Sequence, residues 1–184
     1  MMLSESHRQT LKELALASIK HGLAHGRPLK IDLSTLDQEL TVIRATFVTL
    51  QKHGQLRGCI GMLEAHRPLA QDIAENSYAA AFSDPRFPPL TEDELNDLNI
   101  NLSILSPAEI IPCHSEEDLL QQLRPDIDGL ILDDGMHRAT FLPSVWESLP
   151  DATDFVQHLK LKAGLPINYW ASDLLAYRYT TESF

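Results

Sequence analysis

Cysteine is scarce in this chain of 184 residues, which contains Cys59 and Cys113 and no others. Two cysteines provide no disulfide framework of the kind that holds small secreted domains together. Free thiols in this number are typical of a reducing compartment, so we expect a cytoplasmic location. The N-terminus also lacks a basic segment followed by an apolar core, and we therefore expect no secretory signal.

Positive charge is also in short supply, because 15 lysine and arginine residues face 26 aspartate and glutamate residues, a net charge of −11. An acidic surface repels phosphate backbones, so we expect no general nucleic-acid binding. Long apolar runs are missing too, and none approaches the roughly 20 residues of a membrane-spanning helix. Hydrophobic residues still make up 43% of the chain, which is enough for a globular core. We expect a single domain over residues 1–184.

The spacing of apolar residues predicts several helices. The first follows a capping box at Ser6-His7-Arg8-Gln9 and ends near Gly22 and Gly26. A second begins with Pro68 at its first position and stops at the proline-rich residues 84–89. Shorter helices are predicted after Ser115, over residues 143–149 with Trp146 buried, and from Thr153 or Asp154 to Gly164.

Strands are predicted between these helices. β-branched residues favour a strand over residues 41–50, and a turn at 52–55 lets residues 56–60 return antiparallel to it. Further strands are expected over residues 98–104, on both sides of Asp134-Gly135, and over 174–180. Hairpins interleaved with helices, without regular βαβ units, predict an α+β fold with a largely antiparallel sheet packed with helices.

The stretch Leu56-Arg57-Gly58-Cys59-Ile60-Gly61 holds the most chemistry in the fewest residues. Cys59 is a candidate catalytic thiol, because the Arg57 cation two residues away would lower its pKa. The other interpretation is a small buried side chain that fills the core. A thiol nucleophile needs a base, and His66 and His158 are the candidates for that role.

The same stretch and the residues after it include candidate binding groups. Gly58 and Gly61 allow either a cradle of backbone amides for an anion or a bulge in the sheet. Arg86 could bind a carboxylate or phosphate, or could simply pair with Asp84 or Asp72. Asn76 lies among small and apolar residues, and a buried amide needs partners, so it could orient the motif.

Other polar residues support a site less directly. His21 and His25 are four residues apart and could share a metal ion on a continuous helix, but Gly22 and Gly26 make that helix doubtful. We therefore expect no metal site, and the sequence indicates no particular cofactor. Lys160 and Lys162 cannot share a helix face, so one is expected to be solvated.

Segments spread over nearly the whole chain carry a resemblance to a known family. They are Leu56–Gly61, Asn76–Phe82, Asp84–Leu90, Asp128–Leu130, Val145-Trp146, His158–Leu165 and Tyr177-Arg178. On these segments the chain resembles the AMMECR family, which in prokaryotes is also called AmmeMemoRadiSam system protein A. The six-residue cysteine motif is the hallmark of that family.

This resemblance implies a fold of a larger and a smaller lobe, and an activity that is not settled. It also implies an association with a Memo-like protein and a radical SAM protein. The resemblance places His158 in a family segment, which adds it to the candidate substrate-binding residues.

Three functions are compatible with these residues. The first is a small-molecule enzyme, or an enzyme subunit, with a cleft lined by Arg57, Cys59, Asn76 and Arg86. The second is a non-catalytic module that recruits a partner enzyme, and the third is a structural adaptor. The first requires that Cys59, Asn76 and Arg86 approach one another, which the order of the predicted elements favours.

Overall fold

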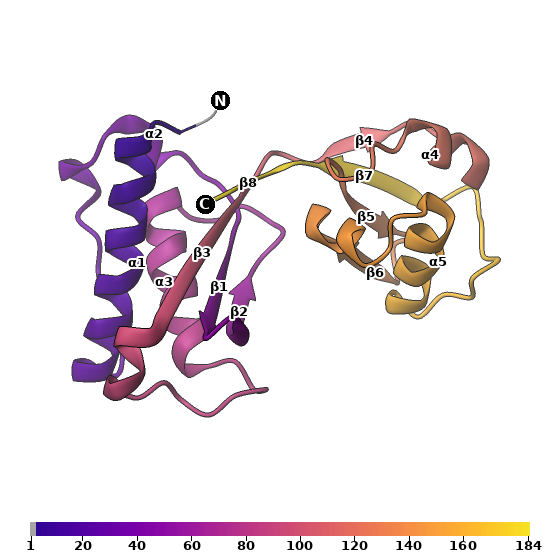
Figure 1. Ribbon diagram of the computed structural model, residues 1–184. Coiled ribbons are helices and arrows are strands. Elements are labelled where there is room, and N and C mark those ends of the chain that lie inside the picture. Colours follow the sequence, from indigo (N-terminus) through magenta and orange to yellow (C-terminus); the bar gives the residue numbers. More distant parts are fainter. Residues whose placement is uncertain (1–2) are drawn as a thin grey trace. The chain divides into compact units, whose positions relative to one another are not determined.

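The computed structural model describes residues 3–184, which form two compact units. Unit 1 runs to Leu105 and takes in Glu182–Phe184 at the end of the chain, and unit 2 is Ser106–Thr181. Each unit contains a four-stranded antiparallel sheet and helices (Figure 1). The α+β class and the larger and smaller lobes are confirmed, with two sheets instead of one. The assignment of residues 1–184 to a single domain stays a prediction.

Unit 1 has one long helix, a second helix of moderate length and three short helical segments. They are α1 (Glu5–His25), the 3₁₀ helix η1 (Leu33–Thr35), α2 (Gln38–Thr41), α3 (Leu69–Phe82) and the 3₁₀ helix η2 (Glu92–Asp97). Ser4 caps α1 by accepting a hydrogen bond from the backbone N–H of His7. The predicted cap at Ser6 was therefore displaced by two residues, and Pro68 precedes α3 as its N-cap instead of opening it.

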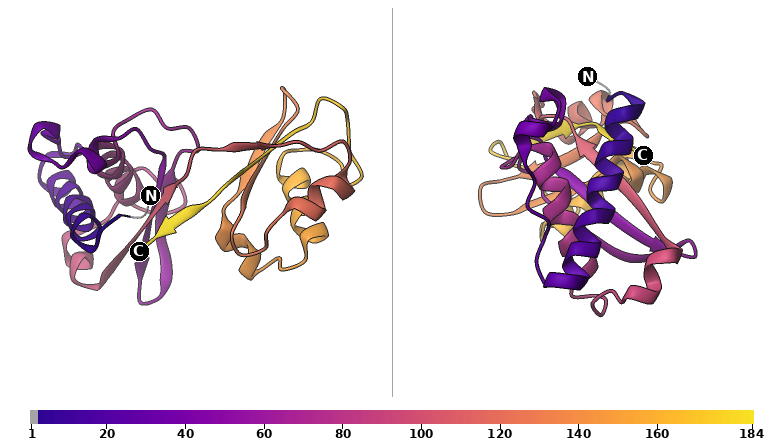
Figure 2. Two further views of the ribbon diagram at one scale, coloured as in Figure 1. Left: turned by 90° about the horizontal axis from the view of Figure 1, so that it is seen from above. Right: turned by 90° about the vertical axis from the view of Figure 1, so that its left-hand side faces the viewer.

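The sheet of unit 1 has the strand order β2-β1-β3-β8. Its strands are β1 (Thr46–Lys52), β2 (Gln55–Gly61), β3 (Leu98–Leu105) and β8 (Thr181–Ser183). The predicted hairpin of β1 and β2 is confirmed, although β1 starts at Thr46, later than expected. Thr41 belongs to α2, and Ile43 forms an isolated bridge with Pro68 outside the sheet. The chain end is held beside β3, where Leu102 and Phe184 exchange two backbone hydrogen bonds (Figure 2).

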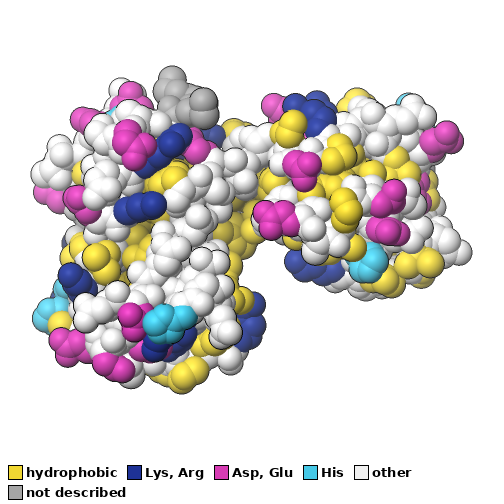
Figure 3. All heavy atoms as spheres, in the orientation of Figure 1, with side chains coloured by type: hydrophobic (Ala, Val, Ile, Leu, Met, Phe, Trp, Pro, Cys, Tyr) yellow, Lys and Arg dark blue, Asp and Glu magenta, His cyan; other side chains and the backbone are white. Residues whose placement is uncertain are grey.

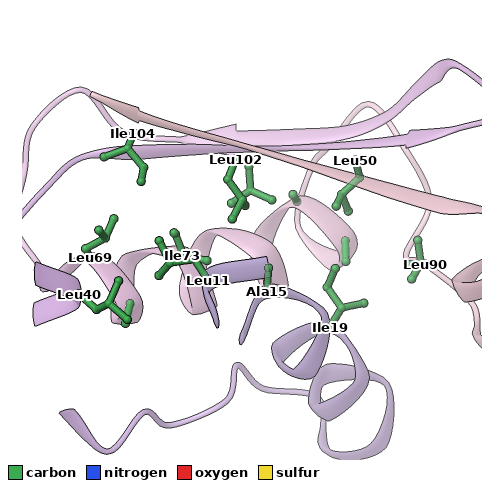
Figure 4. Close-up of a cluster of buried hydrophobic side chains, with 14 residues drawn as sticks. Leu11, Ala15, Ile19, Leu40, Leu50, Leu69, Ile73, Leu90, Leu102 and Ile104 are labelled. Carbon is green, nitrogen blue, oxygen red and sulfur yellow. The ribbon is translucent and has the colours of Figure 1, made fainter. Parts of the chain in front are cut away.

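Helices α1 and α3 supply the apolar face that covers this sheet. Leu11, Ile19 and Ile73 are fully buried, and they meet Leu50 and Leu102 from the strands (Figure 4). One face of α3 is buried throughout, and it consists of Leu69, Ile73, Ser77 and Ala80. This packing fixes α3 against the hairpin that carries the cysteine motif.

Unit 2 packs its own sheet against helices, in the strand order β4-β7-β5-β6. Its elements are β4 (Glu109–Ile111), α4 (Glu116–Gln122), β5 (Gly129–Asp133), β6 (Arg138–Phe141), the 3₁₀ helix η3 (Pro143–Glu147), α5 (Ala152–Lys162) and β7 (Leu175–Tyr179). Trp146 is buried, as predicted, and stacks on Phe155 with ring centroids 3.8 Å apart. Lys160 is also fully buried, where its Nζ lies 2.6 Å from Glu116, and Lys162 is the exposed member of the pair.

Acidic side chains are scattered over both units on the face drawn in Figure 3. This distribution is consistent with the net charge of −11. None of the helices described for residues 3–184 is both long enough and apolar enough to cross a membrane.

Candidate functional site

The cysteine motif forms most of β2, and a β-bulge interrupts it at Arg57. Leu50 of β1 is paired with Gly58, whereas the next residue, Gln51, is paired with Leu56. Arg57 is therefore the extra residue on β2, and a bulge of this kind redirects the side chain of the residue that it leaves unpaired. Of the two interpretations of the glycines, the bulge is the one that the structure contains.

Arg57 is directed to the segment that follows the proline-rich loop. Its Nε and Nη2 each donate to Glu94 over 2.9 Å, and Nη2 also donates to the Pro88 carbonyl over 3.0 Å. Lys52 adds a third cationic contact to the same carboxylate. The hydrogen bond from Arg57 is the main cause that lowers the pKa of Glu94 from 4.5 to about 2. Arg57 therefore belongs to an ion-pair network with Glu94 and Lys52.

Close packing of the backbone accounts for both glycines of the motif. A Cβ atom at Gly58 would overlap the carbonyl oxygen of Ala80, which shows how closely α3 approaches β2. A Cβ atom at Gly61 would overlap the Thr46 carbonyl oxygen and the Phe47 ring. Any larger residue would push the helix or the neighbouring strand away.

Cys59 lies on the edge strand β2, and its backbone groups are satisfied by the loop that begins at Asp84. The Cys59 N–H donates to Asp84 Oδ2 over 2.9 Å, and Arg86 Nη2 donates to the Cys59 carbonyl over 3.3 Å. The Asp84 carboxylate and the Arg86 guanidinium thus make the backbone hydrogen bonds that a neighbouring strand would make if β2 were not at the edge of the sheet. The predicted proximity of Arg86 to Cys59 is present in the structure.

Asp84 and Arg86 form a two-point ion pair of unequal burial. Arg86 Nε and Nη2 donate to the two Asp84 oxygens over 2.9 and 2.7 Å. The Asp84 side chain is 2% exposed and that of Arg86 is 54% exposed. Hydrogen bonds from Arg86, together with the N–H of Cys59, hold the pKa of Asp84 well below its usual range. The same pair raises the pKa of Arg86, with a smaller electrostatic contribution from Cys59.

The Cys59 thiol is partly exposed, and its nearest polar partner is Thr49, whose Oγ1 lies 3.3 Å from Sγ. Arg86 is the cation that bonds to the backbone of the same residue, and Cys59 contributes the last of the causes that raise the pKa of Arg86. Neither candidate base forms a hydrogen bond to Cys59 within residues 3–184. His66 lies 3.4 Å from Glu64, and the exposed His158 contacts the Asp154 carbonyl oxygen in unit 2.

Asn76 takes part in a separate network with Asp72. Its Nδ2 donates to the Thr46 hydroxyl and to Asp72 Oδ2, each over 3.0 Å, and Arg67 also pairs with Asp72. These contacts join α3 to the start of β1. Asn76 therefore holds the scaffold together, and the three-residue cluster of Cys59, Asn76 and Arg86 is reduced to Cys59 and Arg86.

Asp84 and Glu94 are the anchors that sequence reasoning undervalued. Asp84 was considered only as a partner of Arg86, and its bond to the Cys59 N–H was not foreseen. Glu94 sits in a capping box with Thr91, and it also binds Arg57. Among residues 3–184, no group of three or more His, Cys, Asp or Glu side chains is placed to hold a metal ion.

We predict that an alkylating reagent labels Cys59 faster than Cys113 at neutral pH. Both thiols are partly exposed, but burial and the charge of Asp118 raise the pKa of Cys113 and so deplete its thiolate. Mass spectrometry of the native protein over time measures both rates. Equal or slower labelling of Cys59 would show that its thiol is protected, and labelling in urea gives the intrinsic rates for comparison.

Acid should weaken unit 1 as Glu94 becomes protonated. Its pKa is lower in the folded state, about 2 instead of 4.5, so its contribution to stability is complete above pH 4.5 and is lost as the pH falls toward 2. Glu94→Gln should cost about 1–3 kcal/mol at pH 7. Urea unfolding followed by circular dichroism at pH 7 and near pH 2 tests this, because the difference between wild type and variant should shrink in acid. A constant difference would contradict the assignment.

The structure thus defines an α+β protein in which a bulged, glycine-rich edge strand is fastened to a proline-rich loop. Comparisons with known proteins assign this architecture to a family. The family model AMMECR1 matches residues 12–184. A protein of Methanothermobacter thermautotrophicus is 35% identical, over 99% of this chain and 95% of its own length. A Thermotoga maritima protein is 37% identical, over 92% of this chain and 94% of its own.

A solved structure supports the same assignment. The crystal structure of the uncharacterized protein PH0010 from Pyrococcus horikoshii superimposes with a TM-score of 0.84 at 31% identity. It covers 95% of this chain, and 88% of PH0010 is matched. The chain belongs to the AMMECR1 family.

Proposed function

We propose that this AMMECR1-family chain is an enzyme subunit that holds a small anionic molecule beside Cys59. The observation that carries the proposal is the fixed orientation of the Arg86 guanidinium together with its one nitrogen that is unbonded within residues 3–184. Two of its nitrogens are fixed on the buried Asp84, so the guanidinium has one orientation although its side chain is 54% exposed. Within the described part of the chain, its Nη1 has no hydrogen-bond partner. A guanidinium that is held in place by Asp84 and keeps Nη1 free can donate a hydrogen bond to a carboxylate or a phosphate.

The surroundings of Arg86 favour an anion as well. Arg57 and Arg86 each have their guanidinium carbon within 6.0 Å of the centre of the Phe87 ring. Arg57 Nη1 is buried without a hydrogen-bond partner among residues 3–184, and such a donor is often satisfied by a bound water or ligand. The ion pairs around them join three cations, Lys52, Arg57 and Arg86, to two carboxylates. This network therefore carries a positive charge on an acidic protein.

Cys59 gives the proposed subunit a reactive group next to that anion site. Arg86 Nη2 donates to the Cys59 carbonyl over 3.3 Å, so a ligand held by the same guanidinium would lie beside residue 59. The proposal includes the Memo-like and radical SAM proteins as partners in one pathway, which rests on the family resemblance alone. In the alternative, the same surface binds without thiol chemistry and recruits a partner enzyme.

Mass spectrometry of molecules that co-purify with the native protein tests the anion site. We expect an anionic metabolite with the wild type and at least a tenfold loss with Arg86→Lys, which keeps the charge but not the fork. Arg124→Lys is the matched control, because Arg124 is also paired with a buried carboxylate, Asp128, and is 50% exposed. Equal retention by both variants would reject the site.

Complementation of a host that lacks the gene separates the two functions. Cys59→Ser should keep the bound anion in either case, because the anion contacts are made by Arg86. Loss of complementation with the anion retained supports an enzyme subunit, whereas full complementation supports a binding module.

A further inference from the structure

Helix α1 continues through Gly22, the first of the two glycines near which the sequence predicted its end, and stops before the second, Gly26. A Cβ atom at Gly22 would lie 2.5 Å from the Phe82 ring and 2.7 Å from the Tyr78 ring, so this glycine lets the two aromatic side chains of α3 pack against α1. The Tyr78 hydroxyl also donates to the Gly26 carbonyl over 2.8 Å. Gly26, in the left-handed region at φ 66°, then ends the helix. The last turn of α1 is therefore fixed from α3.

This continuity places two histidines on one face of the helix. His21 and His25 are four residues apart, and their ring centroids lie 4.4 Å from each other. His21 is partly exposed and His25 is exposed. Within residues 3–184, neither imidazole has a hydrogen-bond partner, so all four ring nitrogens are available. The physical objection to a metal at this position, a helix broken at Gly22, is removed.

We propose that His21 and His25 form a two-ligand site for a divalent late-transition-metal ion such as Ni²⁺, Cu²⁺ or Zn²⁺. Imidazole nitrogens bind these ions at about 2.0–2.1 Å, so two ligands of one ion lie no more than about 4 Å apart. Rings with centroids 4.4 Å apart can meet that limit by rotation of their side chains. Water completes the coordination sphere, because no third protein ligand among the described residues joins the pair.

The charges near the C-terminal end of α1 limit the affinity of this site for a metal ion. Burial, His25 and Arg27 each lower the pKa of His21. The Arg27 cation also opposes a divalent ion, so we expect a moderate affinity. Affinity should follow the order Cu²⁺ > Ni²⁺ that imidazole ligands show.

Calorimetric titration of the full chain with NiCl₂, in a buffer that does not bind metals, tests the site. We expect one ion per chain and at least a tenfold weaker affinity in His21→Asn and in His25→Asn. His66→Asn is the control, because it removes an exposed histidine that pairs only with a carboxylate, and it should bind as the wild type does.

Both substitutions replace side chains that face solvent at least partly, and the circular dichroism spectrum should confirm that α1 is unchanged. A wild-type affinity in either variant, or an equal loss in His66→Asn, would show adventitious binding elsewhere and overturn the proposal. The result is independent of the anion site, because no residue is shared between the two.

Discussion

Gly58→Ala should destabilise unit 1 by about 3 kcal/mol or more, the upper range for overpacking a close contact. The added methyl group meets the backbone carbonyl of Ala80, which cannot rotate away as a side chain could. Either α3 moves outward from β2 or the hairpin distorts, and both changes disturb the Cys59 backbone contacts. We therefore expect the anion site to be lost together with stability.

Gly54→Ala is the control for this prediction. Gly54 also lies in the β1–β2 hairpin, but a Cβ atom there has nothing within 4 Å, and its cost comes from φ 78° alone, about 1–2 kcal/mol. Both tryptophans, Trp146 and Trp170, lie in unit 2, so hydrogen exchange of the α3 amides is the better probe of unit 1. A Gly58→Ala protein as stable as Gly54→Ala would show that α3 can move away from β2 at little cost, which would contradict this prediction.

Arg86→Gln should cost about 2–4 kcal/mol, because it leaves the buried Asp84 carboxylate without its counter-ion. Asp84→Asn should cost less. It leaves Arg86 half exposed, where water can solvate the guanidinium, and an amide oxygen can still accept from the Cys59 N–H. Removing Arg86 should therefore cost more stability than removing the charge of Asp84, because the carboxylate is buried and the guanidinium is not.

The double variant Asp84→Asn/Arg86→Gln tests whether the cost arises from the pair. We expect it to be more stable than the sum of the single losses predicts, with a coupling of about 1–3 kcal/mol. Urea unfolding followed by circular dichroism measures the four proteins of the cycle. Additive losses, or a larger loss for Asp84→Asn than for Arg86→Gln, would contradict the geometry of the pair.

The sequence predicted local features well where a short pattern determines them. The β1–β2 hairpin and the strand β3 both follow from patterns within a few residues. Gly22 and Pro68 were misjudged by comparison. In a sequence, a glycine such as Gly22 indicates the end of a helix. The sequence does not show that the rings of Tyr78 and Phe82 pack where a Cβ atom of this residue would lie.

The site was predicted in part for a related reason. Arg57 lies two residues from Cys59, but its partner Glu94 is 37 residues away, so proximity in sequence did not reveal the ion pair that Arg57 forms. The bulge at Arg57 is what turns the side chain toward Glu94, and a register shift of that kind leaves no signal in the residue pattern. The proximity of Arg86 to Cys59 was predicted from the order of the elements, and it is present in the structure.

The most direct test of the anion site is whether the Arg86 guanidinium binds an anion in solution. In an NMR titration with inorganic phosphate, the Nε–Hε resonance of Arg86 should shift and saturate. That of Arg124, which is bound to Asp128 in a similar way but contacts no aromatic ring within residues 3–184, should stay in place. Equal shifts at both arginines, or none at Arg86, would contradict the account.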